Sequence, residues 1–507
     1  MDVAAIMSSP WYLGLGLLFI VSSVTVLLLN TRQREAVLDR LQLRKRRTSG
    51  ASTPPRSISP TKEKAPLPSK PDYKTAFPPS RRSALVELAE TASGADQKIL
   101  LGQEPPADFL LKDPLPTTQS FSADTNVPKY TPTGFSTAEI KAMGDFPAYD
   151  ILSGVPLPKP YKEFNPKTAR PRPYRPFRWA YHQTMSFNKM ENDWWLEIGN
   201  DYVATIEKRK GIYKKYGKMI MDYLPGSELV CKELMEMCLQ FYCARWPKYF
   251  SLSEDKKTFR NSLLNEDTDI KSLHPLHVLL NNVPEDFAIV LRNEQDGMYY
   301  FRAGVVCSSL GWNVGTKIGM QLEEIHKPIP DYKEKMSFSM DRYFSKMPTN
   351  TPIQRGSWGL EVGTPLFMPP GDPHEKLRES QQASLKIEEC HLRVDWQTLR
   401  RLPLSAGIVF NFTALFTPVQ EFRDEPYIPS IVLKILKEGK KSLMEYKNTW
   451  HVEHVCIPEL EQYEQEQVAQ GLVKPEKEGE EKWTVATLEQ YPYFPGWEEK
   501  WHRQQGY

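Results

Sequence analysis

His326 closes a stretch of residues patterned for a helix, and its position suits a metal ligand. The apolar residues before it recur every three or four positions, which predicts one apolar helical face: Val314, Ile318, Leu322 and Ile325. Pro328 lacks a backbone donor and disfavours helix at the residue before it, so the helix predicted over 312–325 ends at or near His326. At a helix end, one ring N–H can donate to a free carbonyl, which leaves the other nitrogen to bind a metal. A core histidine satisfied by that carbonyl is the alternative interpretation.

A second stretch, His391–Phe410, sets three arginines and one acid on a strand and a turn that lead into the core: Arg393, Arg400, Arg401 and Asp395. Two other groups could bind metal by composition alone. Cys231, Cys238 and Cys243 fall on one predicted helix, and we interpret them as core packing. The run His451–Cys456 alternates like an exposed strand, and we prefer that interpretation to a metal site.

The elements that must position these residues follow from the remaining pattern. Helices are also predicted over 194–216, 228–246, 332–346 and 430–449. Two apolar segments, 286–292 and 298–306, flank a Glu-Gln-Asp-Gly turn and are typical of a β-hairpin, and further strands are predicted over 355–362 and 406–417. The strands gather in the middle of the chain with helices on both sides, so the sequence predicts an α+β domain around an antiparallel sheet.

Composition excludes several classes of protein. The 65 basic and 63 acidic side chains nearly balance, so the overall charge does not indicate a nucleic-acid-binding protein. The six cysteines include no CxxC pair, which favours a reducing compartment and argues against an iron–sulfur cluster in this chain. The sequence has neither a dinucleotide fingerprint nor a phosphate loop, and it also lacks the nucleophile-elbow and HExxH motifs.

The N-terminal part of the chain is patterned for a membrane anchor and a tether. Residues 11–29 are uncharged and apolar, and as a helix they would extend about 28 Å, close to the hydrocarbon thickness of a bilayer. The basic segment that follows, 30–47, predicts that the C-terminal bulk faces the cytosol. Residues 48–150 are rich in Pro, Ser, Thr and charge, which predicts a disordered linker.

Short motifs recur in order between positions 155 and 450: Trp195–Glu197, Asp201, Tyr202, Pro225–Ser227, Pro284–Asp286, Cys307, Trp312, Lys317, Gly319, Leu322, Ile325, His326, Pro328, Pro330, Arg355, Trp358, Arg393, Gln397–Leu399 and Arg401–Pro403. Together they resemble the haem-dependent oxidative N-demethylase family, formerly a domain of unknown function described by an RLP motif. The resemblance covers most of the predicted globular domain.

The resemblance implies a PAS-like fold that binds haem b and a monooxygenase activity on an amine. O2 and supplied electrons would oxidise an alkyl group on a small secondary amine, and the resulting carbinolamine would collapse to a smaller amine and an aldehyde. The electrons would come from separate flavin and iron–sulfur partner proteins, which fits the lack of dinucleotide and cluster motifs here. The implied axial ligand of the iron is His326, because a histidine-bound haem iron is a competent O2 site.

Further roles follow from the resemblance, and the predicted site residues are Asp395, Arg401, His326, Arg355, Arg393, Trp312 and Trp358. The three arginines are candidates to pair with the haem propionates or a distal oxygen, because a guanidinium matches a carboxylate in a bidentate fork. Asp395 is the candidate distal acid, able to relay protons or hold a substrate ammonium. The two tryptophans would shape the pocket wall. Related bacterial sequences tend to carry Glu in place of Asp395 and an arginine in place of Gly311.

The predicted organisation runs in order along the chain: a short N-terminus 1–10, a transmembrane helix 11–29, a basic juxtamembrane segment 30–47, a disordered linker 48–150, the haem-binding domain 151–460 and a polar, aromatic tail 461–507. We predict a single-pass protein of an endomembrane such as the endoplasmic reticulum. The alternatives to an enzyme are a non-catalytic PAS-like haem sensor and a membrane-tethered scaffold that has lost the cofactor.

Overall fold

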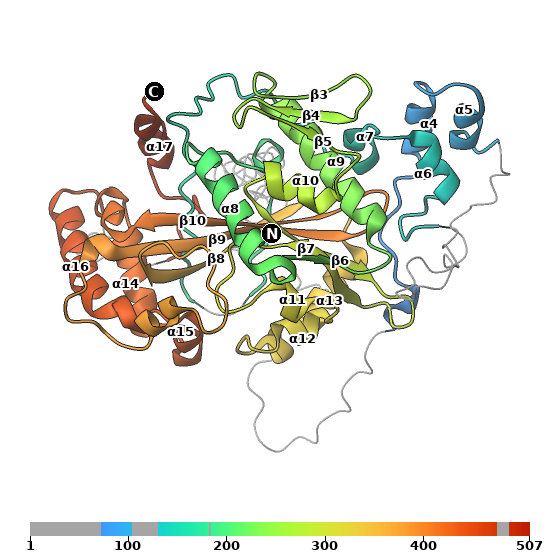
Figure 1. The fold of residues 1–507 in the computed structure, drawn as a ribbon. Helices are drawn as coiled ribbons and strands as arrows, with labels where there is room; N and C mark the ends of the chain where they lie inside the picture. The colour runs from blue at the N-terminus through green and yellow to red at the C-terminus, as the bar shows by residue number, and fades with distance from the viewer. Residues whose placement is uncertain (1–71, 104–129, 182–183, 474–485) are drawn as a thin grey trace, which may run out of the picture. The chain divides into compact units, whose positions relative to one another are not determined.

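A seven-stranded antiparallel sheet forms the centre of the protein, with strand order β1-β8-β9-β10-β6-β7-β2 (Figure 1). The computed structural model describes residues 72–103, 130–181, 184–473 and 486–507, all within one compact unit, Pro71–Tyr507. The strands of the sheet are β1 Asn188–Lys189, β2 Met221–Tyr223, β6 Asp286–Arg292, β7 Tyr299–Val305, β8 Ile353–Val362, β9 Cys390–Arg401 and β10 Ile408–Pro418. A second, three-stranded sheet holds β3 Phe250–Leu252, β4 Thr258–Asn261 and β5 Glu266–Asp269. The predicted α+β architecture with an antiparallel sheet is confirmed.

Long strands β8, β9 and β10 form the part of the sheet that carries the candidate site. β9 pairs with β10 along its whole length, and β8 pairs with β9 from Ile353 to Val362. The predicted hairpin is the pair β6–β7, whose connection spans the Glu-Gln-Asp-Gly turn. β10 also pairs with β6, but only from Ile408 to Phe412.

Helices cover both faces of the sheet. On one side lie α8 Tyr202–Tyr216, α9 Glu228–Arg245 and α10 Pro275–Asn282, and on the other α11 Val314–Lys317, α12 Leu322–His326 and α13 Phe338–Lys346 (Figure 1). The C-terminal helices are α14 Ile428–Glu438, α15 Lys441–Lys447, α16 Trp450–Ala469 and α17 Trp497–Gln505. Because side chains alternate along each strand, both faces of the sheet carry apolar residues, and separate cores form against the two helical layers.

Several predicted elements differ from the structure. The helix predicted over 194–216 begins only at Tyr202, and the helix predicted over 430–449 is divided into α14 and α15. The helix expected over 312–325 is broken into α11 and α12, because Gly319 has a left-handed φ of +87° and Ile318 is extended. The run His451–Cys456, interpreted as an exposed strand, lies inside α16. The apolar residues Val452, Cys456 and Leu460 are spaced by four, and this helical period buries them against α14.

Part of the predicted linker is folded. Residues 84–89, 94–100, 137–143 and 149–153 form helices α4, α5, α6 and α7. Leu85 and Leu88 of α4 join the same apolar core as α9, and Thr133 donates its hydroxyl to the carbonyl of Leu404 at 3.0 Å. These short apolar clusters bury enough surface to order segments whose average composition predicts disorder.

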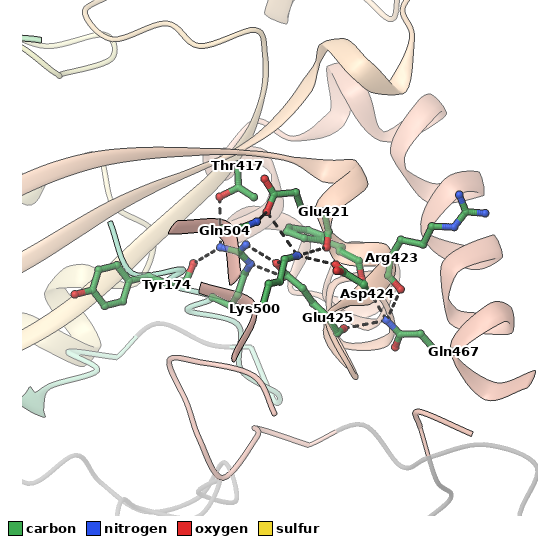
Figure 2. Close-up of polar contacts among 11 residues, drawn as sticks. Tyr174, Thr417, Glu421, Arg423, Asp424, Glu425, Gln467, Lys500 and Gln504 are labelled. Carbon is green, nitrogen blue, oxygen red and sulfur yellow. Dashed lines mark hydrogen bonds and ion pairs between the residues drawn. The ribbon is translucent and has the colours of Figure 1, made fainter. Parts of the chain in front are cut away.

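The C-terminal tail folds against the domain. Its helix α17 docks beside the 419–425 turn through Lys500, whose Nζ lies 3.0 Å from Glu425 and 2.6 Å from Asp424 (Figure 2). The Trp501 indole donates to the carbonyl of Arg170 at 2.8 Å. The tail is therefore a structural part of the unit.

The membrane predictions need correction. None of the helices in the described ranges combines the length and the apolar character that crossing a bilayer requires. This finding contradicts the predicted fold with a preceding transmembrane helix, the membrane as a partner, and the single-pass location in the endoplasmic reticulum with a cytosolic C-terminal domain. The segments on which those predictions rest, 11–29 and 30–47, lie outside the described residues.

Candidate cofactor site

The sheet face on which α12 lies, here called the α12 face, collects most of the predicted site residues. Leu399 of β9 and Leu322 of α12 belong to one apolar core, which fixes the direction of alternate side chains on β9. Asp395 therefore points to the α12 face, and so do its cross-strand neighbour Ser357 and the residue two before it on β8, Arg355.

His326 makes a hydrogen bond to another described residue through only one of its two ring nitrogens. Its Nδ1 lies 2.7 Å from the carbonyl oxygen of Leu322, and because a carbonyl only accepts, Nδ1 carries the proton. The ring stacks on Tyr332 with a centroid distance of 5.1 Å, which fixes its plane. Burial lowers the pKa of His326 to about 4, helped by the charges of Arg355 and Lys317. The imidazole is thus neutral at pH 7, and among the described residues Nε2 has no hydrogen-bond partner, so His326 remains a candidate metal ligand.

Arg355 is a half-buried cation with no counterion. Its Nε is buried without a hydrogen-bond partner, and among the described residues no carboxylate lies within ion-pair distance of its guanidinium. Burial lowers the pKa of Arg355, and the charge of Arg178 adds to this effect. An unpaired charge at such a depth is costly, so the site favours an incoming anion.

Asp395 is held in a fixed orientation and remains partly open. Arg393 donates to its Oδ1 from Nε at 3.0 Å and from Nη2 at 2.8 Å, while the Asp395 side chain stays 38% exposed. Arg393 itself is buried and also donates to the carbonyl oxygens of Pro365, at 2.7 Å, and Ser308. The arginine therefore positions the acid, and the free carboxylate oxygen can accept a hydrogen bond from a bound molecule.

Lys447 is a site residue that sequence reasoning missed. It ends α15 and reaches the outer edge of β8, where Nζ donates to Ser357 Oγ at 3.0 Å and to the carbonyl of Trp358 at 2.6 Å. Burial lowers the pKa of Lys447 to about 7, against the opposing attraction of Asp395. In the sequence it is an ordinary basic residue at a helix C-terminus, so no sequence signal marked it.

The remaining surface of the α12 face is apolar and incompletely covered. Trp312 lies 6.5 Å from the ring of Phe412, which lies 6.4 Å from that of Phe410. These three side chains and Ala414 are only half-buried, although Phe410, Phe412 and Ala414 belong to β10 in the middle of the sheet. Large apolar side chains left open beside unpaired polar groups are typical of a ligand site.

Two predicted site residues lie elsewhere. Arg401 is completely buried and donates to three backbone carbonyls, those of Met347, Phe344 and Ala406, and to the hydroxyl of Tyr299. These hydrogen bonds connect the end of α13 to the turn after β9. Trp358 alternates to the opposite face of the sheet, where its ring packs 5.0 Å from Phe177. Of the predicted site residues, His326, Arg355, Arg393, Asp395 and Trp312 therefore lie on the open part of the α12 face, whereas Arg401 is enclosed at its end and Trp358 lies on the opposite face.

The two alternative metal groups have structural roles. Cys231 and Cys238 are completely buried in the core beneath α9. His451 Nδ1 lies 2.9 Å from the carbonyl of Asn448, and His454 Nε2 lies 2.9 Å from that of Gln382. In the described part of the chain, no three His, Cys, Asp or Glu side chains are grouped so that they could hold a bare metal ion.

The side chains of the α12 face are of the types that a haem requires from a protein. A porphyrin brings four nitrogen ligands of its own, so one neutral histidine nitrogen, such as His326 Nε2, suffices from the protein. The two propionates need cations, and Arg355 and Lys447 are cations without carboxylate partners among the residues described. The half-buried aromatic side chains around them supply an apolar wall.

A family model described as "Haem-dependent oxidative N-demethylase, alpha subunit-like" matches residues 186–457. The matched region contains the whole α12 face and α12 itself, together with Lys447. The match covers more than half of the 507 residues. This protein belongs to the haem-dependent oxidative N-demethylase, alpha subunit-like, family.

Proposed function

We propose that this protein is a haem-dependent monooxygenase that removes an alkyl group from a secondary amine by oxidation. The observation that carries the proposal is the neutral, unpartnered Nε2 of His326 on the same sheet face as the open carboxylate of Asp395. One group suits an iron ligand and the other suits a cationic amine, and the family match supports both assignments.

We assign three residues to holding haem b. Nε2 of His326 would bind the haem iron, and the Leu322 carbonyl orients the ring and fixes its tautomer. Arg355 and Lys447 would receive the propionates, since both are desolvated cations without carboxylate partners among the described residues. Bound haem supplies the iron at which O2 is activated, with electrons delivered by a separate reductase.

Asp395 would bind the substrate. A secondary amine is protonated at neutral pH, and the free oxygen of Asp395 can accept a hydrogen bond from its N–H. Arg393 keeps that oxygen pointed away from the sheet by occupying the other one. Trp312 and Phe412 exclude water on one side, which strengthens the attraction between the carboxylate and the ammonium.

The decisive experiment is a turnover assay with the full chain loaded with haem. Secondary amines of increasing size are supplied with O2 and a reductase, and aldehyde release is measured. Stoichiometric aldehyde and shortened amine would support the proposal. Reversible O2 or CO binding without aldehyde from any amine would contradict it and favour the haem sensor.

Asp395→Asn is expected to lower kcat/KM for the amine by about 100-fold, because the amide keeps the shape but loses the charge that holds the ammonium. Haem content should not change. Asp395→Glu should recover much of the activity, and Asp255→Asn, an exposed turn residue, serves as the control. Aldehyde formation measures the effect. Activity of Asp395→Asn within twofold of the wild type would exclude Asp395 from the site.

Haem affinity is expected to fall as the pH rises above about 7. The amine of Lys447 loses its proton there in the free protein, whereas pairing with a propionate requires the charged form. Haem binding above this pH must therefore take up a proton. Absorption titrations between pH 6 and 9 would show the dependence, and Lys447→Met should abolish it. If the haem affinity of Lys447→Met still fell with pH as in the wild type, cations other than Lys447 would bind the propionates.

A further inference from the structure

Arg400 on β9 is a buried cation for which the described residues provide neither a hydrogen-bond acceptor nor a carboxylate within ion-pair distance. It is 4% exposed, its Nε is buried without a hydrogen bond, and its guanidinium makes no ion pair with any described carboxylate. The other two arginines of β9 differ from Arg400, because Arg393 and Arg401 donate hydrogen bonds to backbone carbonyls and, for Arg393, to a carboxylate. Alternation along β9 turns Arg400 to the face opposite the α12 face, so it has no part in the proposed haem site.

The surroundings of Arg400 do not neutralise its charge. Its guanidinium lies over the ring of Trp195, 4.1 Å from the centroid. The carboxylate of Glu233, the acid in its neighbourhood, accepts the backbone N–H groups of Leu404 at 2.6 Å and Ser405 at 2.8 Å. Burial lowers the pKa of Arg400 to about 10, and at pH 7 the side chain remains charged.

A small pocket lies against this arginine. Its apolar lining includes Val155, Leu157, Met190, Trp195, Met237 and Phe241. The polar residues that line it besides Arg400 are Tyr149, Asp150, Ser153, Asn192 and Gln240. It has room for about 20 Å³, enough for about one water-sized particle. Val155 and Leu157 belong to a segment that precedes the region matched by the family model, so the pocket joins this added segment to the sheet.

We propose that the Arg400 pocket binds a small monovalent anion, either a halide or the carboxylate of a short acid. A buried charge must be compensated, and an anion both compensates it and accepts the hydrogen bonds of the guanidinium fork. A water molecule can accept hydrogen bonds from the guanidinium, but it leaves the charge uncompensated. The small volume favours an ion of one to three heavy atoms. The bound anion would fix the 149–158 segment against β9 and α9.

The test measures the thermal unfolding midpoint of the full chain at constant ionic strength. Gluconate, which is too large for the pocket, is replaced stepwise by chloride or formate. A saturable rise with either of them supports the proposal, because a ligand that binds only the folded state stabilises it. A larger rise with formate than with chloride would identify a small carboxylate as the ligand, since it can accept both bonds of the guanidinium fork. Equal effects of chloride and formate identify a simple anion site.

Two variants and a second measurement make the test specific. Arg400→Met should weaken anion binding at least ~30-fold, whereas Arg260→Met, which removes an exposed arginine paired with Asp267, should leave it unchanged. In the wild type, the anion should slow amide hydrogen exchange over 149–158. Crystals soaked in bromide should show an anomalous peak beside Arg400. Absence of that peak, together with midpoints that respond alike in wild type and Arg400→Met, would overturn the proposal.

Discussion

His326→Ala is expected to abolish stable haem binding. The variant removes the one neutral histidine nitrogen that the α12 face offers to an iron, while the Leu322 carbonyl and the ring of Tyr332 that position it remain. Loss of a partner outside the ligand shell costs about 10–100-fold in affinity, so loss of the ligand itself should cost more than about 100-fold. The measurement is an absorption spectrum of the full chain purified from cells supplied with haem. Wild type should show a Soret band that shifts with CO, and the variant should show none.

Two controls separate ligand loss from a damaged fold. Imidazole added to His326→Ala should restore the Soret band, because it can occupy the space of the missing ring. His277→Ala removes a histidine of α10, on the other side of the sheet, and should leave the spectrum unchanged. A normal, CO-sensitive Soret band in His326→Ala would show that a residue other than His326 binds the iron. If the purified wild-type protein is colourless and does not bind added haemin, the proposal that this protein binds haem is wrong.

The sequence predicted the elements whose pattern is local. The apolar runs on either side of the Glu-Gln-Asp-Gly turn form β6 and β7, and the long helical run predicted after Ser227 forms α9. The helix end at His326 followed from Pro328, because a proline restricts the residue before it regardless of the rest of the fold. These signals need no knowledge of tertiary contacts, and the structure confirmed them.

The sequence did not predict features that depend on which face a side chain takes or on distant partners. Arg393 and Arg401 share one face of β9 but have different roles. Arg393 orients Asp395, whereas Arg401 donates to a backbone carbonyl in the turn after β9. The role of Arg401 depends on the backbone carbonyls of Met347 and Phe344, which lie more than fifty residues away in the sequence and accept its hydrogen bonds. Lys447 reaches the site from α15 across the edge of β8, a contact that no sequence period encodes.

Removal of the Glu425 side chain is expected to destabilise the protein by about 3–5 kcal/mol, the range for breaking a buried ion pair. Glu425 is completely buried and accepts from Arg175 Nε and Nη2, both at 2.6 Å, and from Lys500 Nζ at 3.0 Å (Figure 2). Glu425→Ala leaves the Arg175 charge without this partner in the core, and Lys500 keeps only the more exposed Asp424 and Glu421. Chemical denaturation measures the loss, and hydrogen exchange of α17 should accelerate because the tail loses its anchor.

The nearby pair of Arg423 and Glu466 provides the control for burial. Arg423 Nε and Nη2 lie 2.5 and 2.6 Å from the Glu466 carboxylate, the same fork geometry as at Glu425, but the arginine is 56% exposed. Solvent screens such a pair, so Glu466→Ala should change stability far less than Glu425→Ala. The double variant Arg175→Met/Glu425→Leu should recover part of the loss, because replacing both buried charges removes the unpaired one. Equal losses for Glu425→Ala and Glu466→Ala would show that burial of the network does not anchor the tail.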